Sequence, residues 1–167
     1  MTEDVVRKIK VLHVEDSDTD AYTVERALGR YAKHVFSLHR ARSMQEAEQM
    51  LRESDEWDVV LLDLELPDTK DRTESFMRLE KARRKGMPVL VLTSVNDHEL
   101  ALNLVDNGVE DYVRKSIICS NPDALCEAID FAIHRFKNFQ QMKDSKEKQL
   151  KEKDQVIQWV TGGYSAS

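Results

Sequence analysis

The chain has 167 residues, a length that suits one domain of ordinary size with an added segment. Hydrophobic residues make up 41% of it and charged residues 34%, so it can build a core and keep a hydrated surface. The net charge of −6 argues against a general role in binding nucleic acid or a membrane surface. No apolar run could span a bilayer, and no apolar segment precedes the first expected strand, so we expect a cytoplasmic protein without a secretory signal.

Cysteine usage indicates neither a zinc site nor a disulfide framework. Cys119 and Cys126 are the only cysteines, and their spacing fits no zinc-binding pattern. We expect two reduced thiols.

Short apolar runs alternate with amphipathic segments along the chain. The expected strands are residues 11–14, 35–41, 59–64, 89–92 and 111–114. The expected helices follow them, at about residues 21–31, 44–51, 73–85, 97–107 and 122–159. Five alternations of strand and helix predict a parallel sheet covered by helices on both faces.

Several helix ends carry local signals. Ser43 with Glu46 three residues later predicts a capping box. Gly86 suits the C-terminal cap of the third helix. Asn121 and Pro122 predict the N-cap and the first residue of the last helix.

The last helix is longer than a compact domain needs. Apolar residues recur at three- and four-residue steps up to residue 160, and no Pro or Gly occurs before Gly162. Two interpretations remain open: a coiled coil with another chain, or a frayed, charged helix, since Lys143, Lys146 and Lys153 fall near core positions. We divide the chain into a globular domain over residues 7–136, a helical extension over 137–160 and a disordered tail over 161–167.

Reactive side chains follow four of the expected strands. They are Glu15 and Asp16 after the first, Asp63 at the end of the third, Thr93 after the fourth and Lys115 after the fifth. The carboxyl ends of parallel strands meet at one edge of a sheet, where α/β proteins bind ligands. Three carboxylates repel one another unless a cation lies among them, and oxygen ligands select a hard ion such as Mg²⁺.

The same set suits phosphoryl transfer. Asp63 is the candidate nucleophile that accepts a phosphoryl group. Thr93 would donate a hydrogen bond to one phosphoryl oxygen, and Lys115 would neutralise another.

Four segments carry a resemblance to a known family. They are residues 11–16 (VLHVED), 61–67 (LLDLELP), 91–94 (VLTS) and 108–115 (GVEDYVRK). Together they resemble the receiver domain of two-component response regulators, the CheY-like family, over roughly residues 8–136. The resemblance implies a flavodoxin-like, five-stranded parallel sheet of order 2-1-3-4-5, with helices on both faces and the fifth helix extended.

The resemblance also assigns roles at the edge of the sheet. It implies that Asp63 accepts a phosphoryl group from a histidine kinase or a phosphotransfer protein. It implies that Asp16 and Asp63 bind Mg²⁺ directly, that Glu15 binds it through water, and that the backbone carbonyl of Glu65 completes the protein ligands.

Two residues resemble the switch of the family, and one position departs from its pattern. Thr93 and Tyr112 look like the pair whose rearrangement after phosphorylation changes the surface. Ser116 follows Lys115 where the family usually has a proline, often after a cis bond. A cis bond before a non-proline residue costs about 3–4 kcal/mol, so we expect either a different loop or retained strain here.

The output is expected to be protein association, because too few residues follow position 136 for a DNA-binding effector domain. The partner would be a downstream effector or a second copy of the chain, paired through the last helix. Three alternatives remain: a phosphorelay intermediate or phosphate sink, a degenerate receiver that works without phosphorylation, and a phosphatase of the haloacid dehalogenase type. The last is disfavoured because the acidic pair precedes the candidate nucleophile and no cap domain is present.

Overall fold

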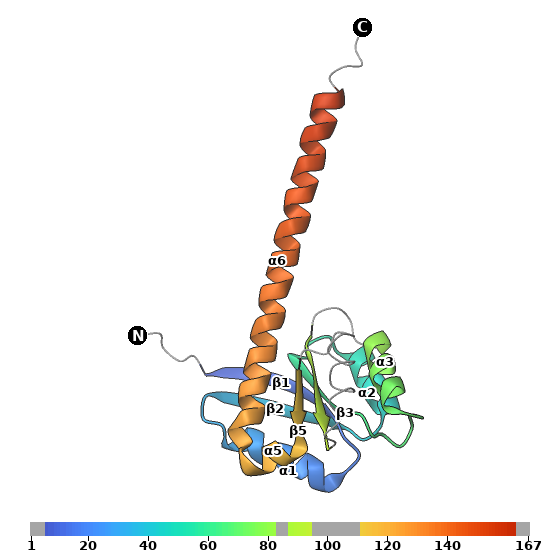
Figure 1. The fold of residues 1–167 in the computed structure, drawn as a ribbon, viewed down its shortest axis with the longest axis vertical. Coiled ribbons are helices and arrows are strands. Elements are labelled where there is room, and N and C mark those ends of the chain that lie inside the picture. The colour runs from blue at the N-terminus through green and yellow to red at the C-terminus, as the bar shows by residue number, and fades with distance from the viewer. Residues whose placement is uncertain (1–5, 83–86, 95–110, 163–167) are drawn as a thin grey trace. The chain divides into compact units, whose positions relative to one another are not determined.

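A computed structural model of the chain describes residues 6–82, 87–94 and 111–162 (Figure 1). The strands are β1 (Arg7–Val14), β2 (His34–Ala41), β3 (Val59–Asp63), β4 (Val89–Thr93) and β5 (Asp111–Arg114). The helices are α1 (Asp18–Arg30), α2 (Met44–Glu53), α3 (Arg72–Ala82), α5 (Lys115–Ser120) and α6 (Pro122–Gly162). The chain divides into two compact units, residues 1–133 and 134–167.

The five strands form one parallel sheet, as the sequence predicted, in the order β2-β1-β3-β4-β5, as the family resemblance implied. All five residues of β3 are buried, which explains why its sequence is almost wholly apolar. β3 lies between β1 and β4, so that Val14 pairs with Leu62 and Asp63 pairs with Leu92. The carboxyl ends of the inner strands therefore lie side by side, which is the condition for a shared site.

Each face of the sheet has its own hydrophobic core, because successive strand residues point to opposite faces. The sheet, α2 and α3 share a core that includes Leu12, Val14, Met44, Ala47, Leu51, Val60, Leu62, Phe76, Leu79, Val89 and Val91. On the other face, the sheet, α1, α5 and the start of α6 share a core that includes Ile9, Val11, Val24, Ala27, Leu28, Leu61, Leu90, Ile118, Leu125, Ile129 and Ala132. Helices on both faces were predicted, and the structure confirms them.

The capping box before α2 is present with one variation. The Ser43 Oγ accepts a hydrogen bond from the Glu46 backbone N–H at 3.2 Å. The Glu46 carboxylate accepts one from the backbone N–H of Arg42 at 2.7 Å, one residue earlier than in the standard box. Both contacts fix the point at which the chain leaves β2 and enters α2.

The sequence did not predict α5, which begins at Lys115 directly after β5. A proline at position 116 would disfavour helical backbone at Lys115, because its ring clashes with the preceding residue. Ser116 imposes no such restriction, so Lys115 can be the first helical residue. The absence of the family's usual proline thus has a direct structural consequence.

The remaining differences concern the ends of helices. α6 continues to Gly162, so Thr161 is helical where the sequence predicted the start of a disordered tail. The expected fourth helix and the cap residue Gly86 lie outside the described residues, as do residues 163–167. Cys119 is exposed, Cys126 is buried, and both are free thiols, as expected. Among the helices that the structure describes, none is both long and apolar enough to cross a membrane.

Candidate functional site

Three carboxyl groups meet at the carboxyl ends of β1 and β3. Glu15, Asp16 and Asp63 each offer an oxygen atom, and these atoms lie within 4.8 Å of one another. Glu15 and Asp63 are buried, whereas Asp16 is exposed. The site is therefore open to solvent on one side, while two of its carboxylates are fixed in the protein interior.

Lys115 supplies the positive charge of the cluster. Its Nζ lies 2.7 Å from Glu15 Oε2, 2.6 Å from Asp20 Oδ2 and 3.4 Å from Asp63 Oδ2. The lysine opens α5 directly after β5, so it reaches the cluster from the far side of β4. Lys115 thereby forms hydrogen bonds with Asp20, which lies 95 positions earlier in the chain, and with Glu15, which lies 100 positions earlier.

The protonation behaviour follows from burial and crowding. Burial raises the pKa of Glu15 to about 7, with a further contribution from the charge of Asp63 and opposition from the Lys115 hydrogen bond. Burial likewise raises the pKa of Asp63, although Lys115 opposes that shift too. Burial alone would lower the pKa of Lys115, but hydrogen bonds to Asp20 and Glu15 and the nearby Asp63 raise it instead. The lysine is therefore cationic at neutral pH.

The donor set of the cluster fits a hard divalent cation. Three carboxylates at this spacing are oxygen-only ligands, and one of them faces solvent, from which a cation could keep several waters. One lysine cannot balance three carboxylates and Asp20 as well, so a further positive charge would relieve the remaining repulsion. The residues present thus fit Mg²⁺, as the sequence predicted for Glu15, Asp16 and Asp63.

Backbone amides hold the two buried carboxylates in place. The Ser17 N–H donates to Glu15 Oε1 at 3.0 Å, and the Glu65 N–H donates to Asp63 Oδ1 at 3.2 Å. Each carboxylate therefore has one oxygen bound to the backbone and the other directed to Lys115. This arrangement fixes both side chains before any ligand binds.

Arg40 fixes the loop between β1 and α1. Its Nε donates to the carbonyl of Glu15 at 2.8 Å and its Nη2 to the carbonyl of Asp16 at 2.7 Å. Its Nη1 pairs with Asp18 at 2.6 Å, which lies at the start of α1. One side chain on β2 thus holds the backbone on which two of the carboxylates depend.

Thr93 and Tyr112 lie on the two strands beyond β3. Thr93 ends β4, one residue after the partner of Asp63 in the sheet, and its side chain is half-buried. Tyr112 pairs with Val91 in the sheet and is 37% exposed. The strands therefore put Thr93 at the edge that carries Asp63, as predicted, whereas the switch role of the pair stays a prediction.

The loop after β3 carries Glu65, whose carbonyl was predicted to bind the metal. The Glu65 side chain is exposed and forms an ion pair with Arg72 at 2.6 Å. Further along this loop, Asp68 accepts hydrogen bonds from the backbone N–H groups of Met44 and Gln45, both at 2.9 Å, at the start of α2. The metal-binding role of the Glu65 carbonyl stays a prediction.

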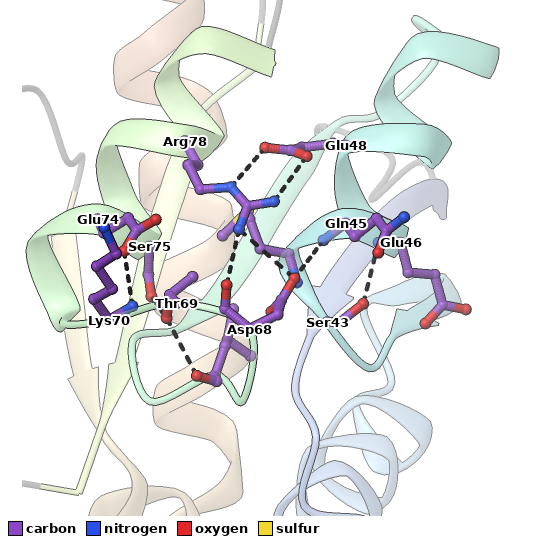
Figure 2. A network of polar contacts seen from close by, with 12 residues as sticks. Ser43, Gln45, Glu46, Glu48, Asp68, Thr69, Lys70, Glu74, Ser75 and Arg78 are labelled. Carbon is purple, nitrogen blue, oxygen red and sulfur yellow. Dashed lines mark hydrogen bonds and ion pairs between the residues drawn. The ribbon is translucent and has the colours of Figure 1, made fainter.

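Figure 2 shows how α2, the loop and α3 are joined. Arg78 of α3 contacts both carboxylate oxygens of Glu48, at 2.9 and 3.0 Å, and donates to the backbone carbonyl of Asp68 at 3.0 Å. The buried Ser75 donates to the carbonyl of Leu64, directly after Asp63. These contacts fix the loop that directly follows Asp63.

Sequence reasoning missed two residues of the site. Asp20 was not among the predicted site residues, and its contact with Lys115 leaves no local signal because the two lie 95 positions apart. Arg40 was not predicted either, although it shares a face of the expected strand 35–41 with Phe36 and Leu38. A charged residue on an otherwise apolar strand face was the signal that could have identified it.

A family model and curated proteins match the sequence of this chain. The family model described as response regulator receiver domain matches residues 11–130. The two-component response regulator ARR18 of Arabidopsis thaliana is 32% identical over 110 residues, which are 65% of this chain and 16% of that protein. The DNA-binding transcriptional regulator NtrC of Proteus hauseri is 27% identical over 122 residues, which are 73% of this chain and 24% of that protein.

This chain therefore spans only a small part of the length of either curated relative. Among solved structures, a response regulator receiver domain protein from Clostridium thermocellum has a TM-score of 0.65 at 24% identity, covering 78% of this chain and 98% of that one. At this identity the likeness establishes the fold alone. Because the family match covers well over half of the sequence, the chain belongs to the family of response regulator receiver domains.

Proposed function

We propose that this receiver domain accepts a phosphoryl group on Asp63 from a histidine kinase or a phosphotransfer protein, with Mg²⁺ bound at the carboxylate cluster. Receiver domains are signalling domains that act between such donors and effectors, and they typically bind Mg²⁺ through acidic residues. The observation that carries the proposal is the position of Lys115, whose Nζ lies within 3.4 Å of both Glu15 and Asp63. A nucleophilic carboxylate beside a buried ammonium group is what phosphoryl transfer needs.

The transfer breaks one bond and forms one, and water supplies the proton that the leaving group needs. A carboxylate oxygen of Asp63 forms a bond to phosphorus while the P–N bond of a phosphohistidine breaks. The departing imidazole nitrogen keeps the electron pair of the P–N bond and takes up a proton from water. Bound Mg²⁺ would supply charge neutralisation at the phosphoryl oxygens, and Glu15, Asp16, Asp63 and the Glu65 carbonyl would hold it.

The residues of this chain have separate tasks in that reaction. The Glu65 N–H orients the Asp63 carboxylate through its hydrogen bond to Oδ1. Lys115 neutralises charge that develops on the phosphoryl group, and Thr93 donates a hydrogen bond to one of its oxygens.

The proposal is tested by incubating the wild type and Asp63→Asn with Mg²⁺ and acetyl phosphate, followed by phosphate-affinity electrophoresis. We expect a retarded band in the wild type alone, and its loss when EDTA removes the metal. A folded wild type without a retarded band would contradict the proposal and favour a degenerate receiver. Steady turnover of a generic phosphomonoester would instead favour the phosphatase alternative.

The lifetime of the retarded band separates the two remaining signalling roles. A phosphorelay intermediate or phosphate sink loses its phosphoryl group to a second protein or to water without a lasting change in association. A receiver with its own output keeps the group long enough to alter a protein contact. The proposal favours the second role because α6 offers a surface for such a contact.

This surface is an apolar stripe on α6. Its members are exposed and lie on one side of the helix at its turn of 3.6 residues: Phe139, Met142, Leu150, Val156, Ile157 and Val160. Exposed apolar residues that share one face of a helix mark a surface for association. We propose that a second copy of the chain covers the apolar stripe in a parallel coiled coil, with an effector protein as the alternative occupant.

Charge complementarity supports pairing between two copies. In a heptad pattern, Leu150 and Ile157 occupy a positions, while Lys146 and Lys153 occupy d positions. In a parallel pair, a side chain at d packs beside the e position of the facing helix. The stems of both lysines can pack there while their ammonium groups turn outward to carboxylates.

Those carboxylates are present at the neighbouring e positions, which are Glu147 and Asp154. In a parallel dimer, Lys146 of one copy faces Glu147 of the other, and Lys153 faces Asp154. An antiparallel pair would bring e positions together and set Glu147 against Asp154, which is repulsive. The sequence of the stripe therefore favours the parallel arrangement.

A further inference from the structure

The contact between Lys115 and Asp20 has no part in the proposed transfer. Asp20 lies in the first turn of α1, where its backbone N–H donates to Ser17 Oγ at 3.3 Å. Its carboxylate extends to the Nζ of Lys115 at 2.6 Å, the shortest contact that the ammonium group makes. The pair joins the start of α1 to the start of α5.

Each N–H donor of the Lys115 ammonium group already faces a carboxylate. This group carries three N–H bonds. Three carboxylates surround it, Asp20 at 2.6 Å, Glu15 at 2.7 Å and Asp63 at 3.4 Å. The donor that faces Asp63 across 3.4 Å is the one that a phosphoryl oxygen on Asp63 would take. Closing this distance to a hydrogen bond would draw the ammonium group away from one of its two short contacts, Asp20 or Glu15.

Solvent exposure decides which contact is the easiest to break. The Glu15 side chain is fully buried, so the loss of its ammonium partner would leave an unpaired buried carboxylate, which is costly. The Asp20 side chain is 40% exposed, so water can replace the lysine. Asp20 is therefore the partner that Lys115 releases.

We propose that Asp20 is a positioning residue that competes with the phosphoryl group on Asp63 for the ammonium group of Lys115, and that it thereby weakens the phosphorylated state. This inference rests on the proposed phosphorylation of Asp63. Asp20 holds Lys115 toward α1 in the unphosphorylated domain, and phosphorylation draws the lysine away from α1. The exchange links the chemistry at Asp63 to the junction between α1 and α5.

The test is the affinity for beryllofluoride, a mimic of the phosphoryl group, measured by ¹⁹F NMR with saturating Mg²⁺. Asp20→Asn should bind it about fivefold more tightly than the wild type, equivalent to about 1 kcal/mol for a partly exposed ion pair. Glu25→Gln is the matched control, because it removes one charge from an exposed position of α1 and should leave the affinity unchanged. A residue with a merely structural role would weaken binding when replaced, so the direction of the change is diagnostic.

A second measurement identifies the cause. The ¹⁵N resonance of the Lys115 ammonium group should move in Asp20→Asn without ligand, and should move in the wild type when beryllofluoride binds. Tighter binding with an unmoved lysine resonance would mean that Asp20 repels the ligand directly, which overturns the proposal. Unchanged or weaker binding in Asp20→Asn also overturns it.

The two proposals fail in different ways. A wild type that binds no beryllofluoride would contradict phosphorylation of Asp63, and the competition at Lys115 with it. A wild type that binds, together with an Asp20→Asn variant of equal affinity, would overturn the role of Asp20 alone.

Discussion

The pKa of His13 is affected by charged residues of the site, although His13 is not one of the site residues. It lies on β1 two residues before Glu15 and is fully buried. Neither ring nitrogen has a hydrogen-bond partner within the part of the chain that the structure describes. Burial, followed by the charges of Lys115 and Arg40, lowers the pKa of His13 to about 3. The ring is therefore neutral at physiological pH and serves as part of the core.

This depressed pKa makes a prediction about stability. The unfolded chain binds a proton at His13 near pH 6.5, whereas the folded domain does so only near pH 3. The contribution of the neutral ring is thus fully present above pH 6.5 and is lost as the pH falls below it. Relative to His13→Leu, the wild type should lose up to about 1.4 kcal/mol of unfolding free energy per pH unit in this window.

Urea unfolding of both proteins at about pH 7, 6 and 5 measures this difference. The comparison removes the effects of other titrating groups, including Glu15, that both proteins share. Identical pH profiles for the two proteins would contradict the prediction.

At the scale of elements, the start of α2 depends on a residue from a distant loop. Asp68 accepts hydrogen bonds from the first two backbone N–H groups of α2, those of Met44 and Gln45. These groups have no partner within the helix, and their charge at the helix N-terminus favours a carboxylate. Burial would raise the pKa of Asp68, but these two hydrogen bonds and the positive charge of Arg78 lower it below its usual value. The same residue joins α2, the loop after β3 and α3 (Figure 2).

We expect Asp68→Ala to lower the unfolding free energy by about 1–2 kcal/mol, since it removes a helix-capping acceptor and a partner of Arg78. Asp68→Asn should lose less, because an amide oxygen still accepts one hydrogen bond. Asp144→Ala, at an exposed position of α6, is the control and should change stability by under about 0.5 kcal/mol. Equal losses in Asp68→Ala and Asp144→Ala in urea unfolding would show that the cap contributes nothing.

At the scale of the whole molecule, the proposed output depends on the pairing of α6 between two copies. Ile157→Asp places a charge in the apolar stripe and should weaken self-association at least about 100-fold, because the charge would be buried without a partner. Gln155→Asp makes the same charge change on the opposite side of α6 and should leave association intact.

Sedimentation equilibrium of the full chain, with and without beryllofluoride, measures both variants. A wild type that stays monomeric at high concentration would contradict pairing between copies and leave an effector helix as the occupant of the stripe. Equal weakening in both variants would mean that net charge, and not the stripe, controls association.

The amino-acid sequence by itself determined the alternation of strands and helices and the edge at which the reactive residues meet, and the family resemblance of its motifs implied the order of the strands. Buried strands such as Val59–Asp63 carry short apolar runs, and helices carry a three- to four-residue period. Parallel strands connected through helices then have few arrangements, so Glu15, Asp63 and Lys115 had to lie at one edge. Local patterns sufficed because each of these residues ends a recognisable strand or directly follows one.

Only the tertiary structure decided which atoms touch. The contacts of Lys115 with Asp20, of Arg40 with the loop after β1, and of Asp68 with α2 join segments far apart in the chain. Side-chain contacts of this kind depend on strand register and on the packing of helices over the sheet, and neither leaves a periodic trace in the sequence. The same packing leaves Asp20 partly exposed and buries Glu15. This difference in exposure determines which of its partners Lys115 releases first.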